Sequence, residues 1–126
     1  MQLLSLGHVT LRSADFDATE RFYAGVLGLR VGPRPALSVP GIWFYLGDEA
    51  VLHVLPPAVN QGAGAAGLID HFALNAQGLS AFQQRLQAAG QAFECRRQAD
   101  TGTWQLFLAD PDGVRVELCF AADEAS

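Results

Sequence analysis

Residues 104–120 read Trp-Gln-Leu-Phe-Leu-Ala-Asp-Pro-Asp-Gly-Val-Arg-Val-Glu-Leu-Cys-Phe, and this stretch decides the fold. Two strand-like segments, Trp104–Leu108 and Val114–Phe120, flank the sequence Asp110-Pro111-Asp112-Gly113. Asp, Pro and Gly favour tight turns because they hydrogen-bond to the local backbone, preset φ, or accept a positive φ. The stretch therefore predicts two strands joined by a tight turn near the end of the chain.

The same order of segments occurs in both halves of the chain. Each half begins with a short strand that carries a histidine near its start, and a helical pattern that ends at a glycine follows it. We expect Asp15 or Asp17 to cap the first helix and Ser80 to cap the second. The expected first half has a strand at 7–11, a helix at 16–27 and strands at 29–32, 42–46 and 50–55; the second has a strand at 70–74, a helix at 80–89 and strands at 92–96, 104–108 and 114–120.

We therefore predict an α+β fold of two βαβββ modules, about 4–56 and 68–121, built on antiparallel or mixed sheets. Residues 56–67 between them are rich in Pro, Gly and Ala, which predicts a flexible linker. A chain of 126 residues that is 50% hydrophobic and 17% charged is long enough to form a core without disulfides. We treat residues 1–126 as a single domain made of the two modules.

The charged residues exclude several functional classes. Eight basic and 13 acidic residues give a net charge of −5, and every basic residue is arginine. An acidic chain without a basic run is a poor nucleic-acid binder, and the absence of lysine excludes lysine Schiff-base chemistry and a Walker-type phosphate loop. We find no apolar run long enough to cross a membrane and no signal-peptide pattern in residues 1–8, so we expect a cytoplasmic protein with free thiols at Cys95 and Cys119.

Four residues of metal-binding type occupy equivalent places in the two modules. His8 opens the first strand of one module, and His71, 63 positions later, opens the first strand of the other. His53 and Glu117, 64 positions apart, fall at matching places in the two last strands. If a pseudo-two-fold axis relates the modules, these side chains can converge on one divalent ion, namely Fe, Zn, Ni, Mn or Co. Four ligands would leave one or two open positions, as catalytic sites do.

Each of these residues also has an ordinary structural explanation. A single histidine in a strand is usually a core or surface residue, and Glu117 could face solvent while Val116 and Leu118 face inward. The occurrence of all four residues at equivalent positions favours the metal site over these explanations.

Four motifs, spread over nearly the whole chain, carry a family resemblance. They are Gly7-His8-Val9-Thr10-Leu11-Arg12, Asp15-x-x-x-Thr19-x-x-Phe22-Tyr23-x-x-Val26-Leu27-Gly28-Leu29, Asp70-His71-Phe72-Ala73-Leu74 and Phe107-x-x-Asp110-Pro111-Asp112-Gly113-x-x-x-Glu117-Leu118. Through them the chain resembles the vicinal oxygen chelate superfamily, which includes glyoxalase I, fosfomycin-resistance proteins, extradiol dioxygenases, methylmalonyl-CoA epimerase and bleomycin-resistance proteins. The motifs are specific for the superfamily and not for one of its activities.

The resemblance implies the glyoxalase-like fold, an open, cup-shaped sheet around a divalent metal ion. His8, His71 and Glu117 match the common His/His/Glu ligand set of the family. His53 stands where glyoxalase I has a second glutamate and where the epimerase has glutamine, and Glu117 and His53 are the implied catalytic residues. The resemblance also implies a homodimer, which would cover open strand edges, with the site in one chain or shared by two.

Strand alternation places further polar side chains beside the expected ligands. Thr10 and Arg12 share the face of His8, and Arg115 and Cys119 share the face of Glu117. We take Thr10, Arg12 and Arg115 as candidate residues for binding a small-molecule substrate. Arg12 matches the His-x-x-x-Arg spacing of glyoxalase I, although it could equally lie at the rim with its charge in water.

The resemblance implies a metal-dependent enzyme of isomerase or lyase type that polarises vicinal oxygens of a small substrate. One alternative is an Fe(II) extradiol-type dioxygenase, because His8, His71 and Glu117 also fit a two-histidine-one-carboxylate triad. Another is a non-enzymatic drug-binding protein of the bleomycin-resistance type, a class that generally lacks the metal ligands present here. A fosfomycin-resistance transferase is not favoured, because the chain shows no cation loop and no lysine-bearing phosphonate site.

Overall fold

The structure is a computed structural model and describes residues 1–2, 4–57, 69 and 71–125. The chain divides into two compact units, Met1–Ala63 and Gly64–Ser126, and each is described by itself. Residues 58–67 of the expected linker lie outside the described residues. None of the described helices is long and apolar enough to cross a lipid bilayer.

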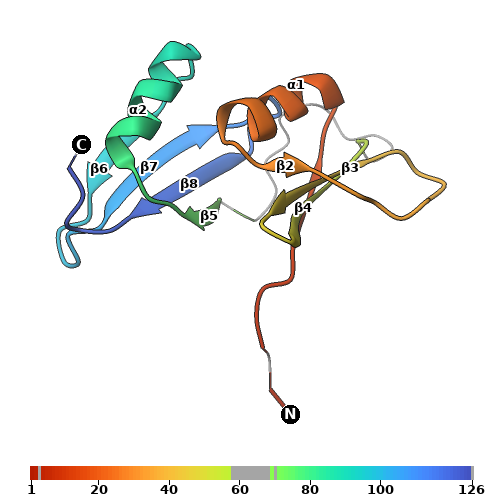
Figure 1. Cartoon of the computed structure of the whole chain (residues 1–126), viewed down its shortest axis with the longest axis horizontal. Helices are drawn as coiled ribbons and strands as arrows, with labels where there is room; N and C mark the ends of the chain where they lie inside the picture. Colours follow the sequence, from red (N-terminus) through yellow and green to blue (C-terminus); the bar gives the residue numbers. More distant parts are fainter. Residues whose placement is uncertain (3, 58–68, 70, 126) are drawn as a thin grey trace. The chain divides into compact units, whose positions relative to one another are not determined.

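The first unit is one βαβββ module (Figure 1). Its four-stranded sheet has the order β1-β4-β3-β2, with β1 parallel to β4 and the other neighbours antiparallel. The parallel pair forms because the helical segment and two strands intervene between β1 and β4, which gives the chain length that a crossover needs. Its elements are β1 Val9–Arg12, α1 Phe16–Glu20, the π-helix η1 Arg21–Val26, β2 Arg30–Val31, β3 Ile42–Leu46 and β4 Glu49–Leu55.

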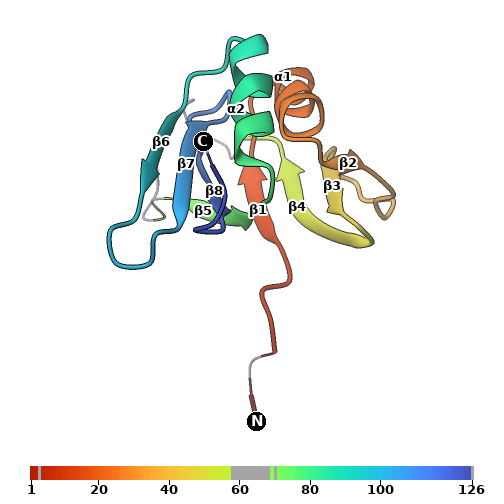
Figure 2. The ribbon, with the colours of Figure 1, turned by 60° about the vertical axis from the view of Figure 1, so that its left-hand side comes forward.

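The second unit repeats this arrangement (Figure 2). Its sheet has the order β5-β8-β7-β6, again with the first strand parallel to the last. The predicted α+β class with two βαβββ modules is confirmed, and both sheets are mixed rather than purely antiparallel. Its elements are β5 Phe72–Asn75, α2 Leu79–Ala88, β6 Glu94–Arg97, β7 Trp104–Ala109 and β8 Arg115–Phe120.

In each unit a helical segment covers one face of the sheet. The Tyr23 ring of η1 is fully buried, and its centroid lies 5.5 Å from that of Phe44 on β3. In the second unit the ring centroids of Phe82 on α2 and Phe120 on β8 are 5.7 Å apart. Because successive strand residues point to opposite faces, this packing leaves His53 and Glu117 on the faces away from the helices.

The first helical segment differs from the expected α-helix at 16–27. Asp15, not Asp17, caps it by accepting a hydrogen bond from the Ala18 N–H at 3.0 Å. After Glu20 the hydrogen bonds change to the wider π pattern, as between the Leu27 N–H and the Phe22 carbonyl at 3.0 Å. The apolar periodicity could not show this change, because one turn of either helix brings nearly the same residues to the buried face.

The prediction that Ser80 caps the second helix was wrong, because the N-terminus of α2 is capped by Glu124, near the end of the chain. The N–H groups of Gly78 and Leu79 donate to Glu124 Oε2 at 2.8 and 2.7 Å, and Ser80 instead accepts a hydrogen bond from Gln84 at 3.4 Å. The Glu124 carbonyl also accepts a hydrogen bond from the Trp104 indole at 2.8 Å. A carboxylate at a helix N-terminus satisfies free N–H groups and interacts favourably with the helix dipole.

Glu124→Ala should destabilise the protein by about 1–2 kcal/mol, because two helix N–H groups lose their acceptor. Urea unfolding followed by circular dichroism would measure this as a lower midpoint. Asp123→Asn is the matched control, since Asp123 is exposed and its substitution removes the same charge from the neighbouring position. Equal midpoints for the two variants would contradict the capping role.

Candidate functional site

His8, Trp43 and His53 form a stack of three rings in the first unit. His8 directly precedes β1, and Trp43 and His53 are cross-strand partners on β3 and β4. The His53 ring lies between the other two. Its centroid is 3.8 Å from that of His8 and 3.9 Å from that of Trp43, and the interplanar angles are 14° and 7°. The stack therefore fixes the ring plane of His53 from both sides.

The surroundings of His53 favour its neutral form. Burial lowers the pKa of His53 below its usual value, and the nearby His8 and Arg34 charges lower it further. A hydrogen bond with the Ala50 backbone opposes these effects without reversing them. At neutral pH the imidazole is therefore uncharged, which is the state in which histidine binds a metal ion.

His71 and Glu117 form a hydrogen-bonded pair in the second unit. His71 Nε2 lies 2.8 Å from Glu117 Oε2, and Gln105 Nε2 donates to the other oxygen, Oε1, at 2.8 Å. The Cys119 thiol also donates to Oε1, at 3.3 Å. Glu117 is only 6% exposed, so the explanation that it is a solvent-facing strand residue was wrong. Its burial is tolerated because both carboxylate oxygens have donors or a polar partner.

These contacts keep Glu117 ionised. Burial by itself raises the pKa of Glu117, but hydrogen bonds from Cys119 and Gln105 and the contact with His71 outweigh it, and the pKa is lowered. The same arrangement raises the pKa of Cys119 to about 11, through burial, the hydrogen bond to Glu117 and the carboxylate charge. Cys119 is thus a protonated donor at neutral pH and not a thiolate nucleophile.

The strand registers place the two pairs at equivalent positions. His53 lies beside Thr10, two residues after His8, and Glu117 lies beside Ala73, two residues after His71. The repeat seen in the sequence therefore corresponds to a repeat in the sheets. Within either unit, the described residues include no group of three or more His, Cys, Asp or Glu side chains placed to hold a metal ion.

The candidate substrate-binding residues lie on the same faces as these pairs. Thr10 is exposed, and Arg12 donates from its guanidinium to the Pro56 carbonyl at 3.0 Å. The Arg115 guanidinium lies over the Phe107 ring, 4.3 Å from its centroid.

Sequence reasoning missed Gln105 as part of the site. Gln105 is a polar residue in the otherwise apolar segment 104–109, and it is the cross-strand partner of Cys119. Those two facts place it on the Glu117 face. The signal was therefore present in the sequence, but Gln105 can be assigned to the Glu117 face only when the register of the hairpin is known.

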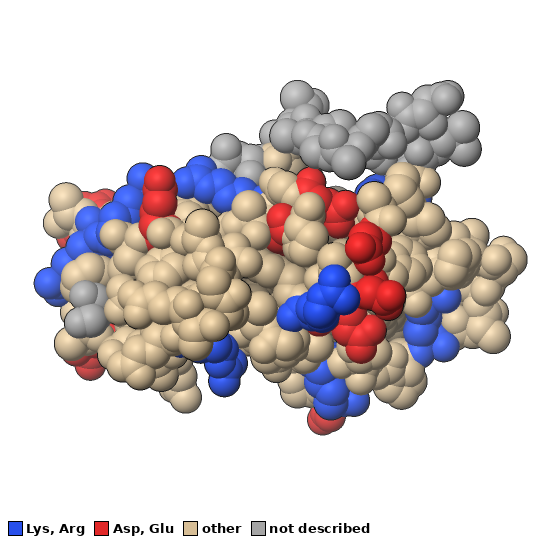
Figure 3. Space-filling view, turned by 90° about the horizontal axis from the view of Figure 1, so that it is seen from above, with Lys and Arg blue, Asp and Glu red and all other residues tan. Residues whose placement is uncertain are grey.

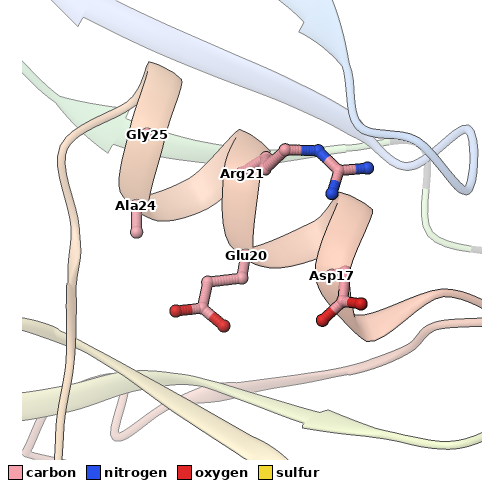
Figure 4. A pocket seen from close by; sticks show the side chains of 5 residues that line it. All are labelled: Asp17, Glu20, Arg21, Ala24 and Gly25. Atoms are coloured by element: carbon pink, nitrogen blue, oxygen red, sulfur yellow. The ribbon is translucent and has the colours of Figure 1, made fainter.

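A shallow hollow on the outside of α1 and η1 is separate from these pairs. It is lined by residues of that one helical segment, and the side chain of Arg21 points away from those of Asp17 and Glu20 (Figure 4). On the face shown in Figure 3, acidic and arginine side chains lie near one another and neutral residues cover most of the surface. The hollow contains none of the candidate residues, so we do not assign the site to it. Its lining residues are Asp17, Glu20, Arg21, Ala24 and Gly25.

Comparison with known proteins places this geometry in a family. The family model of the Glyoxalase/Bleomycin resistance protein/Dioxygenase superfamily matches residues 5–118. A protein called Glyoxylase I 4 from Arabidopsis thaliana is 26% identical over 94% of this chain and 72% of its own length.

Solved structures show the same fold. A glyoxalase family protein from Enterococcus faecalis has a TM-score of 0.71 and 25% identity, over 91% of this chain and 96% of its own. TnmS3, an antibiotic-binding protein from Streptomyces sp. CB03234, has a TM-score of 0.77 at 17% identity, over 96% of this chain and 98% of its own. The match of the family model over most of the chain, with both βαβββ modules, means that this chain belongs to the Glyoxalase/Bleomycin resistance protein/Dioxygenase superfamily.

Proposed function

We propose that the protein is a metal-dependent enzyme of isomerase or lyase type that acts on vicinal oxygens of a small substrate. The observation that carries the proposal is the 2.8 Å contact between His71 Nε2 and Glu117 Oε2 on a buried, ionised carboxylate. We propose further that residues 1–126 act as one domain and that His8, His53, His71 and Glu117 supply the ligands of one divalent ion.

The donor atoms suit such an ion. Ligand atoms bound about 2.1 Å from a metal at right angles to one another are roughly 3 Å apart. The His71 and Glu117 donor atoms are already at a similar distance. Neutral imidazole together with a carboxylate is a donor set suited to Fe, Zn, Ni, Mn or Co.

The neighbouring residues hold these ligands in place. Gln105 and Cys119 both donate to Glu117 Oε1, which leaves Oε2 as the oxygen directed at His71. Trp43 performs the corresponding role for His53 by fixing its ring plane. Hydrogen-bonded and packed ligands of this kind are preorganised, and such outer contacts raise metal affinity.

When bound, the ion supplies Lewis-acid polarisation of two neighbouring substrate oxygens. The protein's own part is to bind and orient the substrate through Thr10, Arg12 and Arg115, which lie on the same faces as the ligand pairs. Three neutral histidines and one carboxylate would leave a dipositive site with a formal charge near +1, which favours an anionic oxygen substrate.

Two other functions are compatible with the family. The antibiotic-binding protein TnmS3 shares the fold, but a binding protein has no need for a buried carboxylate held by three side chains. An Fe(II) extradiol-type dioxygenase would use His8, His71 and Glu117 as its triad. Oxygen-dependent turnover of a catechol by the Fe(II)-loaded protein would favour the dioxygenase over the isomerase or lyase.

Titration of the metal-free protein with Co²⁺ tests the proposed function. We expect stoichiometric binding of one ion per chain, seen in the visible absorption spectrum. Acetohydroxamate, which presents two neighbouring oxygens, should then change that spectrum by occupying open positions. Sedimentation velocity of the loaded protein should show the homodimer that the family resemblance implies. Failure to bind Co²⁺ stoichiometrically, or a spectrum that acetohydroxamate leaves unchanged, would overturn the proposal.

A further inference from the structure

Two arginines contact the same aromatic ring on the second sheet. The Arg96 guanidinium lies over Phe107 at 4.5 Å from the ring centroid, and the Arg115 guanidinium lies over it at 4.3 Å. Phe107 itself is only 4% exposed. Each contact is a cation–π interaction, and together they bring two positive charges to one buried ring.

The two arginines reach Phe107 from opposite sides of β7. Arg96 belongs to β6 and pairs with Gln105, two residues before Phe107. Arg115 belongs to β8 and pairs with Ala109, two residues after Phe107. Both arginines share the sheet face of Phe107, since paired and i+2 residues point to the same side. Figure 2 shows β6 and β8 on either side of β7.

This pair of arginines lies next to the His71–Glu117 pair. Phe107 is the cross-strand partner of Glu117, and the His71 ring meets the Phe107 ring edge-on at 5.7 Å. Arg115 lies two residues before Glu117 on the same strand, about 7 Å along it. A small molecule that contacts the arginines is therefore within reach of the Glu117 carboxylate.

Of the two arginines, Arg96 has no acidic or hydrogen-bonding partner among the residues that the structure describes. The Arg96 guanidinium makes no hydrogen bond or ion pair with the residues that the structure describes, and its recorded contact is the Phe107 ring. Glu117 is on the same face, but its oxygens are already bound by His71, Gln105 and Cys119. Among the residues that the structure describes on the strands of this sheet, Glu94, which pairs with Phe107 on β6, is the other acid on this face.

We propose that Arg96 and Arg115, held by the Phe107 ring, bind a carboxylate group of the substrate. That the bound carboxylate belongs to a substrate rests on the proposed function, whereas the binding of the anion by the two arginines does not. Guanidinium groups donate in a planar fork that matches the two oxygens of a carboxylate, and the stacked ring limits the freedom that binding must remove. The substrate class is thus a small organic acid whose reacting oxygens lie within a few bonds of its carboxylate.

The charges on this face favour a carboxylate over a phosphate. Among the described strand residues of this face, the two arginines and the two acids Glu94 and Glu117 give a formal charge close to zero. A phosphate dianion would bring two negative charges near Glu117 and Glu94, whereas a carboxylate brings one. Inorganic phosphate should therefore bind more weakly than a carboxylate does.

The test is a titration of metal-free protein with succinate, followed through the arginine Nε–H resonances in ¹H–¹⁵N NMR spectra. We expect the resonances of Arg96 and Arg115 to shift, and the dissociation constant to rise roughly ten- to a hundredfold in Arg96→Gln and in Arg115→Gln. Arg96→Lys, which keeps the charge but not the fork, should also weaken binding. Glu94→Gln should strengthen it, because a neighbouring negative charge is removed.

Arg85→Gln is the matched control, because Arg85 lies over Phe82 on α2 and makes a similar arginine–aromatic contact with the same charge. It should leave succinate binding unchanged, and circular dichroism would establish that all variants are folded. No binding of succinate, an equal loss in Arg85→Gln, or tighter binding of phosphate would overturn the proposal. Co²⁺ binding without succinate binding would leave the proposed function intact, and succinate binding without Co²⁺ binding would leave the arginine site intact.

Discussion

Glu117→Ala should weaken Co²⁺ binding by more than about a hundredfold, since loss of an outer contact to a ligand already costs 10- to 100-fold. The variant removes the carboxylate whose Oε2 lies 2.8 Å from His71 Nε2. His71→Ala removes the other member of the pair and should have a similar effect. A chelator competition assay with the metal-free protein would measure both affinities.

The same variants should lose the rise in melting temperature that the metal causes. An ion that binds only the folded protein stabilises it by mass action, and that stabilisation disappears with the affinity. Glu94→Gln is the matched control, because Glu94 is also an acid on the Phe107 face but belongs to β6, at the opposite edge of the sheet from β5, which follows His71. If Glu117→Ala kept stoichiometric metal binding, Glu117 would not be a ligand.

The wild-type protein should have little or no lactoylglutathione lyase activity, although it belongs to the glyoxalase superfamily. The resemblance to glyoxalase I places a glutamate where this chain has His53. A carboxylate there can both bind the ion and take a proton from the substrate carbon, whereas the lone pair of a ligating neutral imidazole is already used. The His53 ring also lies between His8 and Trp43, so neither ring face is open to substrate.

His53→Glu should therefore gain lyase activity, by about a hundredfold or more over the wild type, because general-base catalysis contributes 10²- to 10⁴-fold. The assay uses methylglyoxal and glutathione with each candidate divalent ion. His8→Glu is the matched control, since it introduces the same charge at the other end of the stack. Robust wild-type turnover with any ion, or an equal gain in His8→Glu, would show that the interpretation of His53 is wrong.

The elements with strong local signals were predicted closely. The turn at 110–113 and the strands beside it depend on Asp, Pro and Gly, whose effects act over a few residues. Here Asp110 accepts hydrogen bonds from the N–H groups of Asp112 and Val114. The short strands were predicted less closely, because their ends depend on pairing partners rather than on their own sequence. β2 is one residue shorter at each end than the expected 29–32, and three strands begin two residues later than expected, namely β1, β5 and β6.

The sequence by itself determined the repeat, the fold class and the four candidate ligands. Apolar periodicity and turn residues are local properties, and the equivalent positions of the ligands follow from aligning the two halves of the chain. Tertiary structure decided which groups contact one another. Glu124 caps a helix that begins 45 residues earlier, and Gln105 holds Glu117 from the neighbouring strand. The arginine pair at Phe107 likewise exists only once β6, β7 and β8 are aligned. The Glu124 contact joins residues 45 positions apart, and the other contacts depend on the register between neighbouring strands, which the pattern of a single strand does not encode.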